Sequence, residues 1–410
     1  MIKKNEQTIT SRIDELANFS KPGLGVTRLP FTKQHKEVLK LIISWATTSG
    51  LKTKIDHAGT LIMEYGSDSE KPSFLIGSHQ DTVINGGKFD GIMGVLLPLI
   101  AIERLGDIKL PFNIEILAFA DEEGVRFPTS LIGPRALAGT FDPYVLDFAD
   151  NSGLLLRDSM RDFGLNPNEI LNLARKEKDT LGYLEVHIEQ GPKLEKEGIP
   201  LGVVEAIAGI ERHNLIIEGV AGHAGTTPME LRRDALAASA ELISLTENVA
   251  KKSKSTVATI GSIQVEPNIV NVIPKQVILS LEIRARDDRD RLRLASDLKK
   301  KMTFITEKRG VKFSIKKTYE QRASHCDPNL TKLLEKSLLD IGLNYNRVTS
   351  GATHDASAMV ELCPISMLFV RCREGLSHNP NEYVSENDME LAVQTLQRFF
   401  VQLANEYSNT

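Results

Sequence analysis

The chain has 410 residues, 41% of them hydrophobic and 25% charged, which is typical of globular proteins and long enough for two or three domains with full cores. Fifty basic residues against 54 acidic ones leave a net charge of −4, so neither nucleic acid nor an anionic membrane is an expected partner. The expected partners are a small molecule and a second copy of the chain.

The N-terminus, MIKKNEQTIT, has basic residues without an apolar segment behind them, and the longest apolar run, broken at Pro98, is shorter than the ~18 residues that cross a bilayer. Three cysteines, Cys326, Cys363 and Cys372, are too few and too irregularly spaced for a disulfide framework or a zinc knuckle. We therefore expect a cytoplasmic protein.

The first half of the chain alternates helical and strand patterns. A helix is predicted from Thr32, because Val38, Ile42 and Trp45 recur at helical spacing and Gly50 follows as a C-cap. Short apolar runs at 73–76 and 112–120 then flank a helical pattern that includes 95–104, and residues 183–188 alternate, with His187 on the polar face. This order predicts an α/β domain with a mostly parallel sheet.

From Gly209 the pattern changes to strand, helix, strand, strand, helix, strand. The predicted ranges are 213–219, 231–249, 256–265, 276–284, 289–308 and 311–316. This βαββαβ order is typical of a ferredoxin-like module. Because a helix, an apolar strand and a final helix follow it, we expect a module over 209–320 inserted into an α/β domain formed by 1–208 and 321–410.

The first polar motifs follow the strand at 73–76. In GSHQDTV, His79 comes just after the strand, and Asp81 is placed to accept the second imidazole N–H. Asp90, in FDGIMGV, ends a glycine-rich loop where a helix begins. A metal ligand and a helix N-cap are both open interpretations of Asp90.

In FADEEGVRF, Asp121, Glu122 and Glu123 directly follow an apolar strand, where three adjacent carboxylates repel one another unless cations or protons offset them. A solvated acidic turn is the alternative interpretation. If the site is catalytic, one carboxylate can bind a metal while its neighbour moves the proton of the attacking water.

The motif GLSHNPNE places His378 in a loop after the strand at 365–370, where a surface histidine is the alternative. The complete set, rather than any member, indicates a metal site, because each member follows or lies on a predicted strand. Its members are His79, Asp90, Glu123, His187 and His378. Mixed imidazole and carboxylate ligands suit zinc or manganese.

The inserted module has candidates of its own. In GHAGTTPMELRRDA, residues 227–230 form a predicted capping box with proline at the first helical position, which leaves His223 without a structural explanation. Asn271 in NIVNVIP and Arg284 at a strand end could hold a carboxylate, with a surface cation as the alternative for Arg284. Outside the module, His354 beside Asp355 is interpreted as a hydrogen-bonded loop pair.

Taken together, the strings GSHQDTVINGGKFDGIMGV, FADEEGVRF, VHIEQGPKLE, GHAGTTPMELRRDA, NVIP, SGATHDA and GLSHNPNE resemble the hydantoinase/carbamoylase family of amidohydrolases. That family includes allantoate amidohydrolase, N-carbamoyl-L-amino-acid hydrolase, β-ureidopropionase and ureidoglycolate amidohydrolase. The similarity extends from GVTRLPF, near Gly25, to the final helix. Two strings depart from the usual pattern: SGATHDA has Thr353 where glycine is usual, and GTLIMEY replaces a GNL pattern.

The resemblance implies a catalytic domain that holds two divalent ions per subunit, zinc or manganese, bridged by Asp90. Glu122 would be the general base, and Asp81 belongs with the catalytic residues. The other ligands would be His79 and His187 for one ion, and Glu123 and His378 for the other.

The resemblance also implies that the inserted module is a lid and the dimerisation domain of a homodimer. His223, reaching the active site of the partner subunit, would stabilise the developing oxyanion. The substrate carboxylate would be held by Gln190, His223, Asn271, Arg284 and the backbone around Gly351.

The implied activity is hydrolysis of the ureido C–N bond of a small N-carbamoyl-type acid. Allantoate, which would release ammonia and carbon dioxide, is favoured over N-carbamoyl-L-amino acids and β-ureidopropionate because of the overall similarity of the motifs. An aminoacylase or peptidase of the wider dinuclear group is a distant alternative, against which His187 and the HAGTTPM string argue. A non-catalytic metal-binding dimer is the alternative from a different class.

Overall fold

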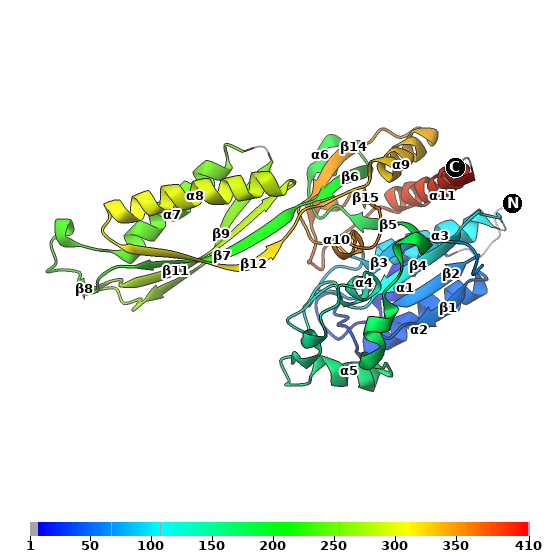
Figure 1. The fold of residues 1–410 in the computed structure, drawn as a ribbon, viewed down its shortest axis with the longest axis horizontal. Coiled ribbons are helices and arrows are strands. Elements are labelled where there is room, and N and C mark those ends of the chain that lie inside the picture. The colour runs from blue at the N-terminus through cyan, green and yellow to red at the C-terminus, as the bar shows by residue number, and fades with distance from the viewer. Residues whose placement is uncertain (1–6, 67, 107, 254, 409–410) are drawn as a thin grey trace. The chain divides into compact units, whose positions relative to one another are not determined.

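A computed structural model describes residues 7–408 except 67, 107 and 254, and it divides the chain into two compact units (Figure 1). The first unit comprises Met1–Glu205, His325–Val348 and Thr353–Thr410. The second comprises Ala206–Ser324 with Thr349–Ala352. The second unit is therefore built mainly from one stretch, residues 206–324, which lies between parts of the first unit in the sequence.

A nine-stranded sheet forms the centre of the first unit. Its strands are β1 (Lys52–Ile55), β2 (Leu61–Tyr65), β3 (Ser73–His79), β4 (Asn113–Phe119), β5 (Thr180–Ile188), β6 (Leu201–Ile207), β13 (Ser324–His325), β14 (Asn346–Ser350) and β15 (Ile365–Val370). Their order is β1-β2-β4-β3-β5-β15-β6-β13, with β14 also paired to β6. The four central strands, β4, β3, β5 and β15, are parallel, while β2 and β6 run antiparallel to their central neighbours. The predicted mixed α/β fold with a mostly parallel central sheet is confirmed.

Several helices of the first unit pack against this sheet. The helices of the first unit are α1 (Ile9–Ala17), α2 (Lys33–Thr48), α3 (Ile92–Leu105), α4 (Ile132–Leu137), α5 (Leu156–Phe163), α6 (Lys193–Glu197), α9 (Pro328–Asp340), α10 (Ala356–Met359) and α11 (Glu386–Ser408). Its 3-10 turns are η1 (Pro143–Asp147), η2 (Pro167–Leu173), η3 (Glu177–Asp179) and η5 (Arg373–Gly375). Helix α3 packs on β3 and β5, and α11 packs on β15. Helix α11 packs on α3 and α9, and α10 packs on α4.

The central strands are buried on both faces, as expected of a parallel sheet covered by helices. All seven residues of β3 and all seven of β4 are buried. The alternation in β5 therefore does not separate a core face from a solvent face: Glu185 and His187 are 0% and 2% exposed. Strand β3 also extends three residues beyond the predicted end at residue 76, so that His79 is its last residue.

The second unit has its own sheet and its own core. Its elements are β7 (Gly209–Glu218), β8 (Gly222–His223), η4 (Met229–Leu231), α7 (Ala235–Ala250), β9 (Thr256–Glu266), β10 (Val272–Ile273), β11 (Gln276–Ala285), α8 (Asp288–Lys308) and β12 (Lys312–Gln321). The four long strands are antiparallel in the order β12-β7-β11-β9, and β8 pairs with β10. Alternate β11 residues, among them Val277, Leu279 and Leu281, form the core with α7 and α8. The βαββαβ order and this strand order are those of a ferredoxin-like fold.

The predicted capping box at residues 227–230 is wrong. Helix α7 begins at Ala235, and the Asp234 carboxylate caps it by accepting the N–H groups of Leu236 and Ala237 at 2.9 Å. Residues Met229–Leu231 form only a 3-10 turn, and the Thr227 carbonyl accepts from the Arg232 side chain. The local sequence favours a helix start, but these residues form the connection between β8 and α7 instead.

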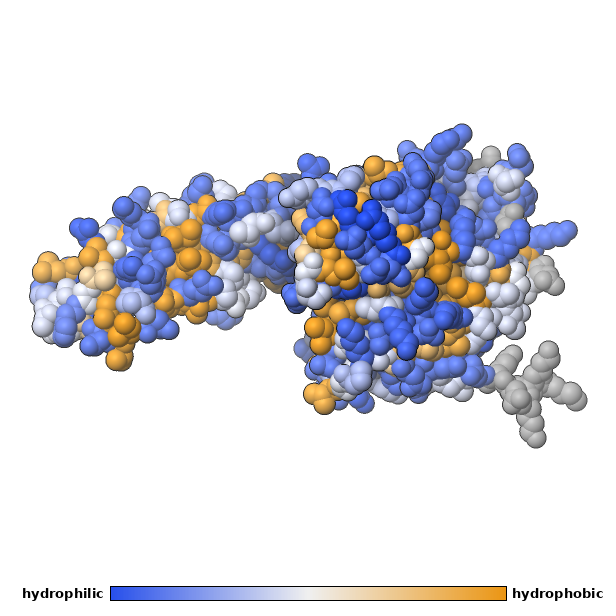
Figure 2. Space-filling model, turned by 90° about the horizontal axis from the view of Figure 1, so that it is seen from below, coloured by the Kyte–Doolittle hydropathy of each residue, from blue (hydrophilic) through white to orange (hydrophobic). Residues whose placement is uncertain are grey.

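Exposed apolar side chains gather at the end of the second unit that carries β8 and β10 (Figure 2). Met229, Leu231 and Val270 are 73%, 69% and 102% exposed. Over the described part of the chain, no helix is both long and apolar enough to span a bilayer.

Candidate metal centre

The carboxyl ends of the parallel strands bring the predicted ligands together. His79 ends β3, His187 is the second-last residue of β5, and Glu122 and Glu123 follow β4 after a short turn. His378 lies in the loop after β15. Because parallel strands end at the same edge, this edge is where open α/β sheets bind their ligands.

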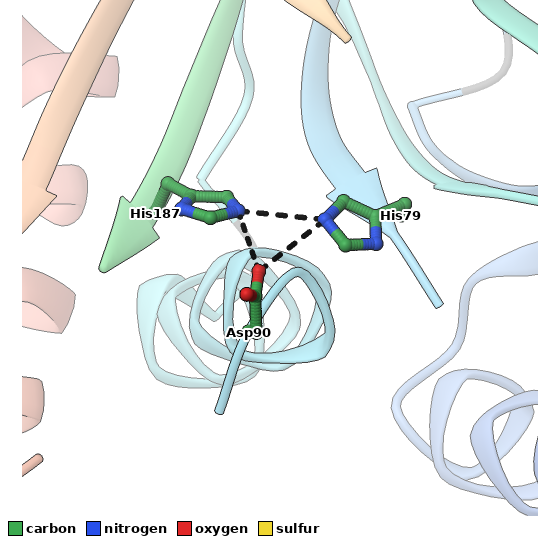
Figure 3. Close-up of side chains that lie close together, drawn as sticks. All are labelled: His79, Asp90 and His187. Atoms are coloured by element: carbon green, nitrogen blue, oxygen red, sulfur yellow. Dashed lines mark hydrogen bonds and ion pairs between the residues drawn. The ribbon is translucent and has the colours of Figure 1, made fainter. Parts of the chain in front are cut away.

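Asp90 lies between two buried imidazole rings. Its Oδ1 is 3.1 Å from His187 Nε2 and 3.5 Å from His79 Nε2, and the two nitrogens are 3.4 Å apart (Figure 3). All three side chains point their polar atoms at one spot and are at most 5% exposed. Two imidazole nitrogens and a carboxylate oxygen in this arrangement could hold a metal ion.

A second group of possible ligands shares Asp90. Its other oxygen, Oδ2, is 3.4 Å from His378 Nε2, which in turn is 3.5 Å from Glu123 Oε1. Glu123 Oε1 is buried and makes no hydrogen bond within the described residues, and His378 is half exposed. Asp90 thus presents one oxygen to each group, as a carboxylate that bridges two ions would.

Glu122 belongs to a third group, with His79 and Glu123. Burial raises the pKa of the Glu122 carboxyl well above its usual value, although the nearby His79 opposes the shift. A buried carboxyl with a raised pKa is suited to act as a general acid or base. With Glu122 9% exposed and Asp121 0% exposed, the alternative of a solvated acidic turn is excluded.

The electrostatics of the edge favour a cation. Burial, and then the charge of Asp90, raise the pKa of Glu123 to about 7. Bringing Glu123 and Asp90 together is therefore unfavourable unless protons or a cation offset their repulsion. Nitrogen and oxygen ligands within 4.8 Å of one another fit zinc or manganese, so the donor set suits the predicted cofactor.

Asp90 is not a helix N-cap. The N-cap of α3 is Gly91, without a side-chain cap bond, and the Asp90 carboxylate instead accepts from Ser377 Oγ at 2.7 Å and from Gln190 Nε2 at 3.0 Å. Both donors reach Oδ2. The local interpretation of Asp90 as a cap is therefore excluded, and its side chain is oriented by residues 100 and 287 positions away.

Asp81 supports the site differently from the prediction. Its backbone carbonyl, not its carboxylate, is closest to His79 Nδ1, at 3.0 Å, while the carboxylate oxygen lies 3.5 Å away. The carboxylate accepts the N–H groups of Glu122 and Glu123 at 3.1 and 3.2 Å. Asp81 therefore links the loop after β3 to the loop after β4, and its carbonyl orients the His79 ring.

His354 and Asp355 are not a hydrogen-bonded pair. Both are buried, and neither carboxylate oxygen of Asp355 has a hydrogen-bond partner within the described residues. The His354 ring instead lies edge-on to the His187 ring, with centroids 4.5 Å apart. His354 also forms a possible ligand group with Glu185 and His187.

The remaining predicted residues belong to the second unit. His223 on β8 lies opposite Val272, and Asn271 accepts the N–H of Ala224 at 3.0 Å. Arg284 pairs with Glu282 at 2.7 Å and donates to the carbonyl of Gly351. His223 and Asn271 are thus neighbours at the small two-stranded sheet of β8 and β10, and their roles stay predictions.

Two residues at the site were not predicted. The Ser377 hydroxyl donates to Asp90, and the Glu382 carboxylate accepts the backbone N–H groups of Phe89 and Asp90. Both lie in the string GLSHNPNE, whose histidine alone was singled out. The polar residues close to His378 in this string were the signal from which Ser377 and Glu382 could have been predicted.

The chain is similar to several known proteins. A family model described as peptidase family M20/M25/M40 matches residues 75–402. An N-carbamoyl-L-amino acid amidohydrolase of Geobacillus stearothermophilus is 36% identical over 402 residues, covering 97% of this chain and 98% of the relative. Allantoate deiminase 1 of Glycine max is also 36% identical, over 413 residues that cover 92% and 86%.

Among solved structures, an amidase of the hydantoinase/carbamoylase family from Burkholderia multivorans matches with a TM-score of 0.89 at 29% identity. The match covers 96% of each chain. Both units are therefore included in the similarity, since neither alone accounts for 96% of the residues.

Proposed function

Because this chain belongs to the M20/M25/M40 peptidase family, and within it to the hydantoinase/carbamoylase amidases, we propose that it hydrolyses the ureido group of a small acid, with allantoate as the substrate. The chain is an amidohydrolase, and the family is metal-dependent. The observation that carries the proposal is the position of Asp90 between two ligand groups, with buried Glu122 beside them.

The reaction converts a ureido group, R–NH–CO–NH2, and one water into an amine, carbon dioxide and ammonia. Bound divalent ions supply an acidified water and a polarised carbonyl. Glu122 takes the proton of the attacking water and gives it to the leaving nitrogen. The raised pKa of its carboxyl suits this task, because the group must both accept and release a proton near neutral pH.

Two ions, zinc or manganese, account for the ligand set. His79 and His187 would hold one of them and Glu123 and His378 the other, and Asp90 belongs to both ligand groups. The support is that each set of three forms a group in which all ligand atoms lie within 4.8 Å.

Substrate recognition is assigned to Gln190 and to residues of the second unit, His223, Asn271, Arg284 and the backbone at Gly351. The Gln190 amide nitrogen is engaged by Asp90, whereas its buried Oε1 has no hydrogen-bond partner among the described residues. That oxygen is available for an N–H group of the substrate. The guanidinium of Arg284 offers the planar donor pair that a substrate carboxylate needs.

Allantoate and N-carbamoyl-L-amino acids are distinguished by assay. The zinc- or manganese-loaded protein is incubated with allantoate, N-carbamoyl-L-amino acids, β-ureidopropionate and an N-acetyl amino acid, and ammonia and amine are measured. Allantoate is expected to give the highest kcat/KM. Faster release from an N-carbamoyl-L-amino acid assigns the second candidate, which the Geobacillus relative favours. If none of the compounds releases ammonia or amine, the alternative of a non-catalytic metal-binding protein is favoured.

The second unit is proposed to pair two subunits. Strand β9 lies at one edge of its sheet and exposes Val257 and Ile263 by 63% and 47%. An edge strand with apolar side chains offers both backbone and hydrophobic contacts to a second copy. Light scattering after size-exclusion chromatography is expected to give the mass of a dimer, and Val257→Lys is expected to shift it towards the monomer.

A further inference from the structure

Glu382 is a buried carboxylate that contacts the loop at residues 87–90, which carries Asp90, but it belongs to no possible ligand group among the described residues. It is 3% exposed, and its Oε1 accepts the backbone N–H groups of Phe89 and Asp90 at 2.9 and 3.0 Å. These residues are 293 and 292 positions away in the sequence. Glu382 therefore fixes the backbone of the residue whose side chain is shared by two ligand groups.

The chain before Asp90 is shaped to receive this carboxylate. A Cβ atom added to Gly87 would lie 2.3 Å from Glu382 Cδ and Oε1, closer than any real contact allows. Only glycine lets the backbone approach so closely. The rings of Phe89 and Tyr383 add an edge-on contact between the same segments, with centroids 6.2 Å apart. Two hydrogen bonds, one close backbone approach and one ring contact thus join the 87–90 loop to the 382–383 segment.

The loop that carries His378 also contacts the side chain of Asp90. Ser377 donates to Asp90 Oδ2 and accepts from Gln190 Nε2 at 3.1 Å. His378 and Gln190 both have φ values near +55°, a region that non-glycine residues seldom occupy and that neighbours must stabilise. Because Glu382 lies four residues after His378, it connects this loop to the backbone of Asp90.

We propose that Glu382 is a positioning residue, which sets the metal affinity of the site by holding the backbone of Asp90 against the loop of His378. The inference rests on the proposed metal-dependent function. It assigns Glu382 no contact with substrate or metal. Its effect comes from the two amide hydrogen bonds, so an uncharged acceptor of the same length should replace it.

The test compares Glu382→Ala, Glu382→Gln and a matched control, Glu386→Ala. Glu386 also accepts two consecutive backbone N–H groups from a distant segment, those of Ile9 and Thr10 at 2.9 and 2.7 Å, but neither is a ligand candidate. Zinc affinity is measured for each metal-stripped protein by competition with a chromogenic chelator. Urea unfolding of the same samples reports stability.

Glu382→Ala is expected to weaken zinc binding by about 10- to 100-fold, the usual effect of removing a group that supports a metal ligand. Glu382→Gln keeps an oxygen acceptor and should stay within about threefold of the wild type, a margin well below that effect. Glu386→Ala should lose stability and keep its zinc affinity. If Glu382→Ala does not fold, Gly87→Ala, which displaces the carboxylate from the amides, is expected to weaken zinc binding in the same way.

The proposal is overturned if both Glu382→Ala and Gly87→Ala bind zinc as the wild type does, or if Glu386→Ala loses zinc affinity to the same extent. It is also overturned if Glu382→Gln is as weak as Glu382→Ala, because charge would then be the cause. Wild-type protein that binds zinc but hydrolyses no ureido acid contradicts the proposed function alone. Wild-type protein that binds no zinc contradicts both.

Discussion

At the scale of single residues, the candidate site contains carboxyl groups whose pKa values are raised by burial. Asp121, Glu122 and Glu123 follow one another at the end of a strand, and burial is the largest cause of the raised pKa of each. Their surroundings differ: a hydrogen bond from the Gly124 backbone opposes the rise at Asp121, His79 opposes it at Glu122, and His79 together with His378 opposes it at Glu123. Adjacent carboxylates can therefore take different tasks.

Glu122→Gln removes the proposed base without changing the size of the side chain. We expect kcat for the best ureido acid to fall by about 10²- to 10⁴-fold, the usual contribution of general acid–base catalysis. Zinc content, measured by elemental analysis, should not change, because Glu122 is not assigned as a ligand of either ion. Activity equal to that of the wild type would remove Glu122 from the mechanism.

His35, outside the candidate metal centre, is a buried histidine with a predictable pH effect. It is 0% exposed, accepts the N–H of Phe31 at Nδ1 and stacks on Phe163 at 4.7 Å. Burial, and then the charge of Arg28, lower the pKa of its imidazole from 6.5 to about 3. The folded state keeps this ring neutral while the unfolded state protonates it.

The stability that His35 contributes is therefore complete above pH 6.5 and decreases as the pH falls towards 3. Between pH 7.5 and pH 5 the loss is about 2 kcal/mol, since each unit of pKa difference corresponds to roughly 1.4 kcal/mol. Urea unfolding at both pH values should show a smaller pH dependence for His35→Asn, which keeps an acceptor for Phe31 but cannot be protonated. Equal pH dependence in the two proteins would show that His35 is not the group responsible.

At the scale of elements, the packing of α3 against β3 and β5 brings Asp90 to the histidines. A Cβ atom on Gly91 would lie 2.4 Å from the His79 ring, and one on Gly94 would lie 2.0 Å from the carbonyl oxygen of Val186. The first turns of α3 therefore lie directly on the ends of both strands. This close approach explains how a residue just before a helix reaches two strand-end imidazoles.

Gly94→Ala should force α3 away from β5. We expect the free energy of unfolding to fall by about 1–3 kcal/mol, as for other overpacked sites, together with weaker zinc binding because Asp90 moves with the helix. Gly261→Ala on β9 is the control, since its Cβ would meet only Ser280 Oγ at 3.5 Å. Unchanged stability in Gly94→Ala, measured by urea unfolding, would mean that the helix can move at little cost.

At the scale of the whole molecule, metal binding is assigned to the first compact unit and most of the substrate contacts to the second. The candidate metal ligands are all in the first unit, whereas His223, Asn271 and Arg284 are in the second. Each unit has its own hydrophobic core. The second unit also begins and ends side by side, because Ile210 on β7 pairs with Gln321 on β12.

Replacing residues 211–320 by a short glycine-serine linker should therefore leave the first unit folded. The shortened protein is expected to bind zinc with an affinity close to that of the full chain, because no assigned ligand is removed. It should release no ammonia from ureido acids, because His223, Asn271 and Arg284 are missing. Ammonia release at the full-length rate would show that the second unit is not needed for recognition.

The sequence alone determined the fold class and the identity of the ligand candidates. Hydrophobic periodicity predicted the parallel sheet and the βαββαβ order, because side-chain spacing reflects the local period of a helix or strand. Strand-end positions predicted His79, Asp90, Glu123, His187 and His378, because parallel strands end at one edge. What these residues imply about metals and substrates came from the family resemblance.

The tertiary structure decided the side-chain contacts, which the local sequence does not determine. The sequence also allowed Asp90 to be a helix cap, and the bonds of its carboxylate to Gln190 and Ser377 excluded that interpretation. Residues 227–230 carry a helix-start pattern, yet the helix begins at Ala235. The burial of Glu122 and the hydrogen bonds of Glu382 depend on segments that are brought together only when the sheet forms, and local spacing contains no information about such distant partners.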